Sequence, residues 1–235
     1  MTKDAKLCLI TGVGPGTGQA LVERFCAGGY QVAMLARSAD RLTEISQRLM
    51  HAHAFPCDVS DSAQLSDTVD QIRTQLGQPE IVIHNAVGGA FGSYADITPE
   101  VLNRNFQINT MALLHLAQQL LPAMIERGHG VLLATGNTSA YRGKANFAGF
   151  APTKAAQRIL IESIARAAGP KGIHAAYVAI DAVIDVPWAR EMMTDKPDDF
   201  FAKPVDIAAE CYHIAHQPRS TWSSELVIRP YGEAW

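Results

Sequence analysis

Short apolar runs alternate with longer amphipathic segments along almost the whole chain. Strand-like runs lie at residues 6–11, 31–36, 52–59, 80–85, 130–135, 173–180 and 224–230. Helical periodicity predicts helices near residues 17–28, 40–50, 61–76, 98–127, 148–168 and 205–217. Near-continuous apolar strands separated by amphipathic helices are typical of parallel sheets that are covered on both faces. The pattern therefore predicts an α/β fold with about seven parallel strands.

Start signals support the predicted helices, and one segment interrupts the alternation. Ser60-Asp61 and Thr98-Pro99-Glu100 precede two of the helices and favour helix N-termini. Residues 186–204 contain prolines, aromatic residues and mixed charge, so we expect a loop with a short helix after the sixth strand. Loops after the carboxyl ends of parallel strands line the ligand crevice of such sheets. We therefore predict that residues 182–204 cover a substrate, within one domain that spans residues 1–235.

The first predicted strand runs directly into a glycine-rich segment, TGVGPGTGQ. Glycines here allow a tight turn and let backbone amides approach a pyrophosphate at the N-terminus of the next helix. A glycine-rich segment alone is commonly a simple turn, but its position between the first strand and the first helix favours dinucleotide binding. The residues expected to contact the dinucleotide are Gly12, Gly14, Gly16, Thr17 and Gly18.

The spacing Thr11-Gly12-x-x-x-Gly16-x-Gly18 resembles the turn of the short-chain dehydrogenase/reductase family, and later motifs extend the resemblance over essentially the whole chain. Asp58-Val59, after the third strand, matches the family's adenine-contacting position. The resemblance implies a single Rossmann-type, doubly wound α/β domain with strand order 3-2-1-4-5-6-7. It also implies that Asp58 and Val59 bind the cofactor.

Two further motifs carry the resemblance into the second half of the fold. Asn85-Ala86 matches part of the family's Asn-Asn-Ala-Gly motif and is expected to bind the cofactor, whereas His84 and Val87 depart from that motif. The segment NFQINTMALL matches the helix that carries the family's active-site asparagine, here Asn109.

The choice of cofactor depends on the residues after the second strand. An acidic residue there would accept hydrogen bonds from a ribose 2′-hydroxyl, whereas this chain has Arg37, with Arg41 one turn further on. This substitution favours NADP(H) over NAD(H). The alternative is that both arginines are ordinary surface charges.

The catalytic motif of the family is altered in this chain. The family places a tyrosine four residues before its lysine and a serine thirteen residues before that tyrosine. Lys154 is in register, but Phe150 occupies the tyrosine position and Asn137 occupies the serine position. The resemblance implies that Lys154 binds the nicotinamide ribose, that Asn109 orders a water near Lys154, and that Asn137 orients the substrate.

Phe150 has no proton to give, and a positioned acid or base commonly contributes about 10²–10⁴-fold in rate. The proton could come from water, from the substrate itself, or from Tyr141 if its loop folds inward. Asp181 and Asp185 are two further candidates, although aspartates in such places are commonly turn formers.

These residues lead to a functional hypothesis and an alternative. The hypothesis is an NADP(H)-dependent oxidoreductase that acts on a CH–OH, C=O or related group of a small organic substrate. The alternative is a catalytically silent NADP(H)-binding sensor or structural module, because the ribose contact of Lys154 does not require the tyrosine.

Composition narrows the remaining classes. With 48% hydrophobic and 18% charged residues and a net charge of −3, the chain is typical of soluble globular proteins and not of nucleic-acid binders. Scattered cysteines favour a reducing compartment, so we expect a cytoplasmic protein without membrane contact. The eight histidines show no metal-ligand spacing, and we expect no metal. By resemblance, the long helix and the alanine-rich helix from 148 imply a homodimer or homotetramer.

Overall fold

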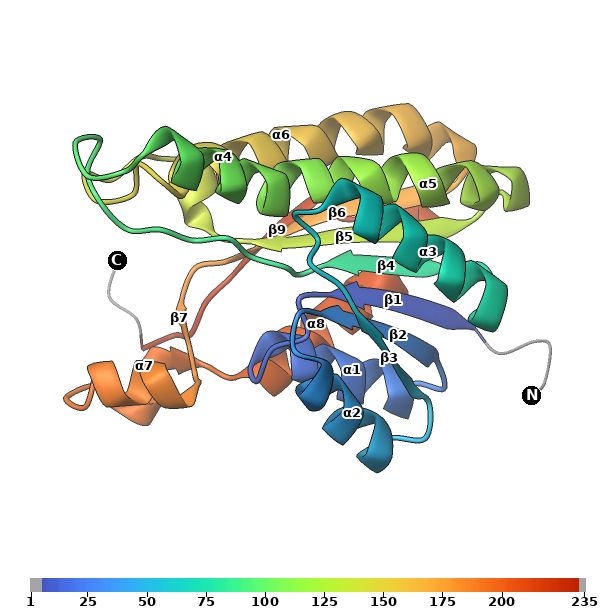
Figure 1. The fold of residues 1–235 in the computed structure, drawn as a ribbon, viewed down its shortest axis with the longest axis horizontal. Coiled ribbons are helices and arrows are strands. Elements are labelled where there is room, and N and C mark those ends of the chain that lie inside the picture. The colour runs from blue at the N-terminus through green and yellow to red at the C-terminus, as the bar shows by residue number, and fades with distance from the viewer. Residues whose placement is uncertain (1–5, 233–235) are drawn as a thin grey trace.

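The computed structural model describes residues 6–232, and one parallel sheet forms its centre (Figure 1). The strand order is β3-β2-β1-β4-β5-β6-β9, and each neighbouring pair is parallel. This confirms the predicted order, with β9 as the seventh strand of the prediction. The strands are β1 (Leu7–Thr11), β2 (Gln31–Ala36), β3 (Ala52–Pro56), β4 (Ile81–His84), β5 (Gly130–Gly136), β6 (Ile173–Ile180) and β9 (Glu225–Ile228).

Helices cover both faces of this sheet, as Figure 1 shows. On one face lie α1 (Thr17–Ala27), α2 (Ala39–Arg48) and α8 (Pro204–Ala215). On the other lie α3 (Ser62–Leu76), α4 (Pro99–Phe106), α5 (Ala112–Arg127) and α6 (Ala151–Ala168). The helix predicted over residues 98–127 is divided, because a π-helical turn at Gln107–Met111 separates α4 from α5. The helix predicted from residue 148 begins at Ala151, with Phe150 at its N-cap.

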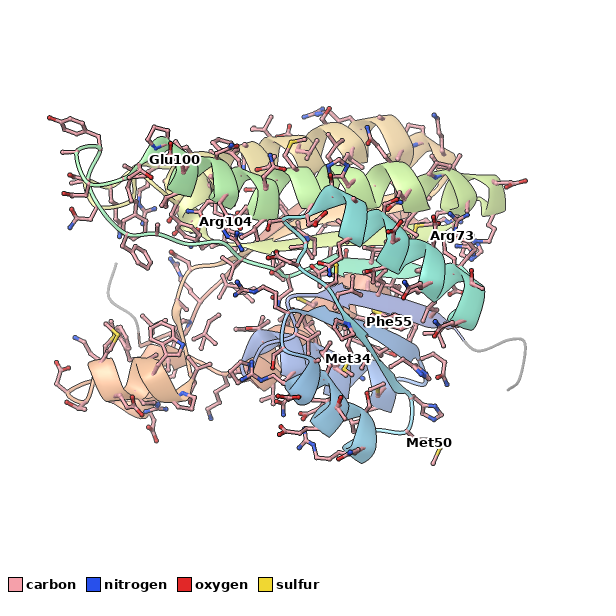
Figure 2. The ribbon with its side chains drawn as sticks, viewed as in Figure 1. Met34, Met50, Phe55, Arg73, Glu100 and Arg104 are labelled. Atoms are coloured by element: carbon pink, nitrogen blue, oxygen red, sulfur yellow. The ribbon has the colours of Figure 1, made fainter. Side chains whose placement is uncertain are left out.

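The core explains why the strand sequences are apolar on both faces. Along β1, Leu7 and Leu9 pack into the α3–α6 layer, whereas Cys8 and Ile10 pack into the α1–α8 layer. Successive side chains of a strand point to opposite faces, so a strand covered on both sides is apolar at nearly every position. Figure 2 shows the difference between a strand and a loop position: Met34 is fully buried in β2, whereas Met50, just before β3, projects from the surface.

The segment after β6, residues 182–204, has its own secondary structure and is called the lid below, after its predicted role. Two-residue strands β7 (Val183–Ile184) and β8 (Phe201–Ala202) pair in parallel, and helix α7 (Pro187–Met192) lies between them. Val186, Ala189 and Phe201 form its apolar centre. The sequence predicts a loop with a short helix here; the structure contains that helix and adds the two strands. Within residues 6–232, no helix combines the length and apolarity needed to cross a membrane.

Candidate active site

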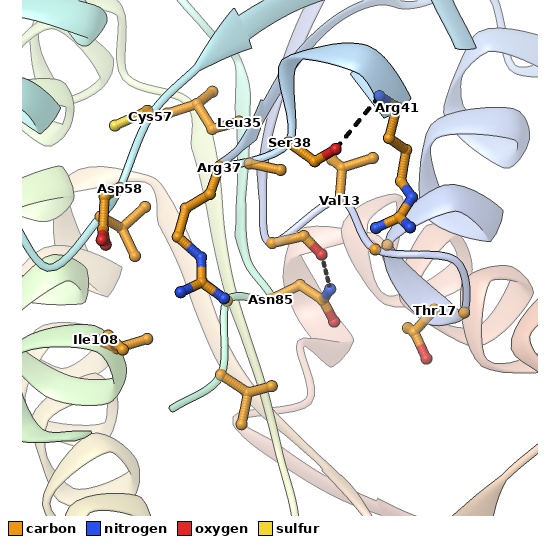
Figure 3. A pocket seen from close by; sticks show the side chains of 18 of the residues that line it. Val13, Thr17, Leu35, Arg37, Ser38, Arg41, Cys57, Asp58, Asn85 and Ile108 are labelled. Carbon is orange, nitrogen blue, oxygen red and sulfur yellow. Dashed lines mark hydrogen bonds between the residues drawn. The ribbon is translucent and has the colours of Figure 1, made fainter. Parts of the chain in front are cut away.

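A cavity of about 430 Å³ lies where β1 to β4 end and the lid begins (Figure 3). Its lining comes from the segments that follow these four strands and from the lid. All predicted cofactor residues except Lys154 lie along it, namely Gly12, Gly14, Gly16, Thr17, Gly18, Arg37, Asp58, Val59, Asn85 and Ala86. Val87, Ile108, Ile184, Val186 and Trp188 add an apolar side to the cavity.

The glycine turn is packed so closely that two of its positions exclude a side chain. Gly12 has a φ of 71°, in the left-handed region, and a Cβ there would lie 2.4 Å from the Cα of Ala86. A Cβ at Gly18 would lie 2.3 Å from the Gly12 carbonyl oxygen. Gly14 faces open space, and a Cβ there would have no atom within 4 Å. Gly12 and Gly18 therefore bring α1 against the ends of β1 and β4.

The start of α1 is prepared for an anion. Gly16 precedes the helix, no side chain caps it, and its first turn contains no acidic residue. The Thr17 hydroxyl oxygen is buried and has no hydrogen-bond partner in residues 6–232. A helix N-terminus with unsatisfied donors and a favourable dipole binds phosphate groups readily. These features fit the pyrophosphate of a dinucleotide.

Two basic side chains, Arg37 and Arg41, also line the cavity. Figure 3 shows Arg37 extending from the end of β2 and Arg41 extending from α2 toward the glycine turn. The Asp58 carboxylate accepts hydrogen bonds from Ser60 and from Arg104, the latter at 3.0 Å. Partial burial opposes ionisation, but the bonds from Ser60 and the charges of Arg104 and Arg37 hold the pKa of Asp58 below its usual value. Asp58 is therefore a fixed carboxylate beside Arg37.

A buried hydrogen-bond network joins the glycine turn to the end of β4. The Asn85 side-chain amide donates to the Gly12 carbonyl at 2.9 Å, and its oxygen accepts from the Thr135 hydroxyl at 2.9 Å. Thr11 Oγ1 accepts from the backbone amides of Asn85 and Ala86, each at 3.2 Å. This network fixes the wall of the cavity nearest Lys154.

His84 lies behind this network. Its Nδ1 is 3.0 Å from Thr11 Oγ1, and its Nε2 is 3.0 Å from the Ile108 carbonyl oxygen. Burial, followed by the charge of Lys154, lowers the pKa of His84 to about 3, so the imidazole is neutral near pH 7. A neutral ring with Nε2–H donates to Ile108 and accepts from Thr11. His84, which departs from the family motif, is therefore a core histidine with both ring nitrogens hydrogen-bonded.

Lys154 is buried on α6, with its ammonium at the end of β5. Nζ donates to the Thr135 carbonyl at 3.3 Å and to Gln157 Oε1 at 2.9 Å. Because the side chain is only 2% exposed, desolvation lowers the pKa of Lys154 to about 7. Thr135 also holds Asn85, so Lys154 is one residue removed from the wall of the cavity.

Phe150 occupies the position of the missing phenol. Its ring centroid lies 5.9 Å from Lys154 Nζ, and its side chain is buried. The ring packs with those of Phe91 and Phe147, at centroid distances of 6.0 and 6.4 Å. The environment of the Lys154 ammonium on this side is therefore aromatic and apolar.

Asn109 is fully buried in the π-helical turn. Its amide nitrogen donates to the Gly88 carbonyl and to the Thr153 hydroxyl, each at 2.8 Å, and its oxygen accepts from the Gly88 amide at 3.0 Å. The side chain thus ties the segment after β4 to α6. Asn109 thus contacts Thr153, the residue before Lys154. Within the described residues, the Asn109 side chain makes no hydrogen bond to Lys154 Nζ.

The remaining candidate residues are turned to other partners. Asn137 Oδ1 accepts from the Ser139 amide at 3.2 Å and caps the short 3₁₀ helix Thr138–Ala140. Asp181 accepts from the Thr138 hydroxyl. Asp185 accepts twice from Arg190, at 2.7 and 2.8 Å, and these bonds lower the pKa of its carboxyl. A carboxyl held ionised in this way is a poor proton donor.

Tyr141 directly follows the 3₁₀ helix Thr138–Ala140, and its side chain contacts Glu225 and Arg158. Its hydroxyl donates to Glu225 on β9, and the Arg158 guanidinium lies over its ring at 4.9 Å. Burial and Glu225 raise the pKa of Tyr141 to about 12. Its contacts in residues 6–232 do not include Lys154 or Phe150, so the inward fold of the loop that this hypothesis requires is absent from the structure.

Sequence reasoning did not find Gln157, Arg104 or the partners of Phe150 in its aromatic cluster. Gln157 follows Lys154 by three residues on a helix, a spacing that places two side chains on one face. Arg104 and Phe91 gave no comparable signal, because only the folded loops bring them to Asp58 and Phe150.

The fold and the cavity together define a doubly wound α/β protein with a dinucleotide-type glycine turn at the carboxyl end of its first strand. The family model described as short chain dehydrogenase matches residues 6–196. The chain therefore belongs to the short-chain dehydrogenase/reductase family.

The individual proteins to which the chain is similar share about a quarter of its residues. The 7alpha-hydroxysteroid dehydrogenase of Escherichia coli K12 is 27% identical over 241 residues, which cover 97% of this chain and 94% of that protein. An alcohol dehydrogenase from the archaeon Thermococcus sibiricus, solved in complex with 5-hydroxy-NADP, has a TM-score of 0.86 at 23% identity, covering 98% and 99% of the two chains. A 7 alpha-hydroxysteroid dehydrogenase complexed with NADH and 7-oxo glycochenodeoxycholic acid has a TM-score of 0.84 at 26% identity, covering 98% and 95%.

Proposed function

We propose that this protein is an NADP(H)-dependent oxidoreductase that acts on a small organic substrate. The observation that carries the proposal is made at the start of α1. The closely packed glycine turn, Thr17 with its buried and unpartnered hydroxyl, and Arg37 all line the same cavity. When bound there, the nicotinamide would supply or accept a hydride. Two of the similar structures are dehydrogenases solved with 5-hydroxy-NADP and with NADH, which supports a nicotinamide dinucleotide as the cofactor.

The protein's own residues would divide the remaining tasks. Lys154, behind the cavity wall, would bind the nicotinamide ribose, and Asn109 would hold the chain that presents Lys154. Asn137 would orient the substrate through its side-chain amide nitrogen, since its oxygen is used in the cap. The aromatic cluster of Phe91, Phe147 and Phe150 favours an apolar substrate surface beside Lys154.

The preference for NADP(H) rests on charge. Arg37 and Arg41 line the cavity, and a 2′-phosphate would form charge-assisted hydrogen bonds there. Replacing Arg37 with aspartate should weaken NADPH binding about ten- to a hundred-fold, since a hydrogen bond to a charged group contributes roughly 1.5–3 kcal/mol. NADH binding should weaken less or improve. Fluorescence titration of both cofactors measures the ratio.

Arg73→Asp, a matched charge reversal on α3 outside the cavity, is the control and should leave the ratio unchanged. Equal loss of NADPH and NADH affinity in Arg37→Asp would contradict the assignment of Arg37 to the 2′-phosphate.

Restoring the phenol tests whether the rest of the site is arranged for carbonyl reduction. Phe150→Tyr should raise ketone reductase activity by about 10²–10⁴-fold, because it places a hydroxyl on a ring whose centroid lies 5.9 Å from Lys154 Nζ. Steady-state rates with NADPH and a panel of ketones measure the gain. Phe147→Tyr, in the neighbouring ring of the same cluster, is the control and should give no gain.

A second candidate function is a catalytically silent NADP(H)-binding sensor or structural module. The observation that favours it is the buried phenylalanine at the acid position. Such a module would bind NADPH tightly and transfer no hydride to any member of a carbonyl, enoyl and imine panel. Measurable turnover by the unmodified protein on that panel would exclude it.

The proposed activity also implies a domain organisation, a location and an assembly. We infer that residues 1–235 act as one NAD(P)-binding domain in the cytoplasm, with residues 182–204 as its substrate lid. We infer a homodimer or homotetramer, and the exposure of Ile159 on α6 supports an interface on that helix. Size-exclusion chromatography with light scattering measures the assembly.

A further inference from the structure

The two oxygens of the Asp58 carboxylate have different partners. Its Oδ1 accepts from the backbone amide and the hydroxyl of Ser60, at 3.0 and 2.7 Å, and its Oδ2 accepts from Arg104 Nη2 at 3.0 Å. Ser60 belongs to the same turn as Asp58, so the turn itself holds the Asp58 side chain in place. Arg104 is therefore not needed to position the carboxylate, and what it adds is a positive charge at Oδ2.

Arg104 reaches Asp58 from outside the cofactor cavity. It lies in the last turn of α4 and is not among the described residues that line the cavity, whereas Asp58 lines it. The next residue of α4, Asn105, is buried and donates to the Gly149 carbonyl at 2.7 Å, which anchors this end of the helix. An arginine on a fixed helix thus neutralises a carboxylate of the cavity without taking up space in it.

Arg37 is a second cation within reach of Asp58. In the parallel pair β2–β3, Ala36 lies opposite Pro56, and the Cys57 amide donates to the Ala36 carbonyl at 2.9 Å. Arg37 and Asp58 follow these paired positions directly, on strands that lie about 4.8 Å apart. Their side chains therefore leave the sheet beside each other, as Figure 3 shows, and their charges interact.

The Arg37 guanidinium nevertheless has no direct partner. It donates no hydrogen bond and forms no ion pair within residues 6–232, and no dashed line reaches it in Figure 3. A carboxylate has about four acceptor positions, and Ser60 and Arg104 use three of those on Asp58. A forked contact with Arg37 would need two positions, so Arg104 excludes it.

We propose that Arg104 is a positioning residue that determines the preference for NADP(H), because by occupying Asp58 Oδ2 it keeps Arg37 free for the 2′-phosphate of the cofactor. This inference rests on the proposed function, in which Arg37 binds that phosphate. Without Arg104, Arg37 is the cation that remains beside the released oxygen, and an ion pair between them would compete with the phosphate. The uncompensated carboxylate would also repel the phosphate, which carries about two negative charges near neutral pH. A cofactor with a 2′-hydroxyl is not subject to either effect.

Two fragments of the cofactors test this role without turnover. Adenosine 2′,5′-bisphosphate and adenosine 5′-monophosphate differ only in the 2′-phosphate, and isothermal titration calorimetry measures the affinity of the cofactor-free protein for each. In Arg104→Met the affinity for the bisphosphate should fall about three- to fivefold, the effect of one partly exposed ion pair. The affinity for the monophosphate should stay unchanged. Arg73→Met, which removes an arginine paired with Asp70 at 3.3 Å outside the cavity, is the control and should change neither affinity.

A double variant distinguishes the proposed role from a direct contact between Arg104 and the phosphate. When Asp58 is replaced with asparagine, no carboxylate remains to capture Arg37. Adding Arg104→Met to Asp58→Asn should therefore leave the ratio of the two affinities as it is in Asp58→Asn alone. A fall in this ratio of the same size with and without the carboxylate would mean that Arg104 acts on the phosphate directly, and it would overturn the proposal.

The remaining outcomes separate this inference from the proposed function. An unmodified protein that binds the bisphosphate no more tightly than the monophosphate would contradict both the NADP(H) preference and the role of Arg104. A preference for the bisphosphate that survives in Arg104→Met would overturn the role of Arg104 alone. Equal loss of both affinities in Arg104→Met would show that Arg104 supports the adenosine site as a whole, and it would overturn the role in specificity.

Discussion

The replacement Lys154→Met should change how the stability of the cofactor-free protein depends on pH. The pKa of Lys154 is lowered from 10.5 to about 7 by burial, so between these values the unfolded chain binds more protons than the folded one. The contribution of Lys154 to the free energy of unfolding therefore rises with pH in this window, by up to about 1.4 kcal/mol per pH unit. Lys154→Met removes this contribution.

Urea unfolding of both proteins from pH 6 to pH 10 measures the effect. Relative to Lys154→Met, the unmodified protein should gain about 3 kcal/mol of stability between pH 7 and pH 9.5. The lost hydrogen bond to Gln157 adds a penalty that is the same at every pH, so the change with pH isolates the titration. Lys171→Met, on the exposed turn after α6, is the control. A difference that does not vary with pH would show that Lys154 has an ordinary pKa.

The replacement Gly12→Ala should damage both folding and cofactor binding. The residue has a φ of 71°, and its new Cβ would lie 2.4 Å from Ala86 Cα and 2.5 Å from Ala86 N, which are backbone atoms. Strain in the left-handed region costs about 1 kcal/mol and overpacking about 1–3 kcal/mol, so we expect a loss of about 2–4 kcal/mol. Relief of the clash must move β1 and β4 apart, which should also reduce NADPH affinity.

Gly14→Ala is the matched comparison for stability, because a Cβ at Gly14 meets no atom within 4 Å. Its midpoint of urea unfolding should stay close to that of the unmodified protein. Equal stability of the Gly12 and Gly14 variants would mean that the close approach of the turn to Ala86 is not a constraint on the fold.

The sheet could be predicted from the sequence because its signal is local. Strands such as β6 are buried along their whole length, so nearly every position is apolar, and the intervening helices are long enough to show their period. The lid strands β7 and β8 have two residues each and leave no period to detect. The π-helical turn likewise depends on tertiary contacts, because Asn109 and Thr110 within it bond to Thr153 on α6.

The candidate site was predictable where it consists of motifs and not where it consists of partners. The residues of the glycine turn, Arg37, Asp58 and Asn85 all line one cavity, as their positions at strand ends indicate. Tyr141 shows the limit. It is close to Asn137 in sequence, but the 3₁₀ helix between them turns its hydroxyl to Glu225. Closeness along the chain does not determine direction across a turn.

The lid has a consequence for the time that a cofactor stays bound. The Val186 side chain packs against the glycine turn, because a Cβ added at Gly16 would lie 2.7 Å from Val186 Cγ1. Within the lid, Arg190 donates hydrogen bonds to Asp185 and Asp198. Val186, Trp188 and Gly16 line the same cavity. We therefore expect a dinucleotide seated on this turn to contact the lid. Exchange of oxidised for reduced cofactor would then require the lid to move, and motions of this kind set turnover in many enzymes whose chemical step is fast.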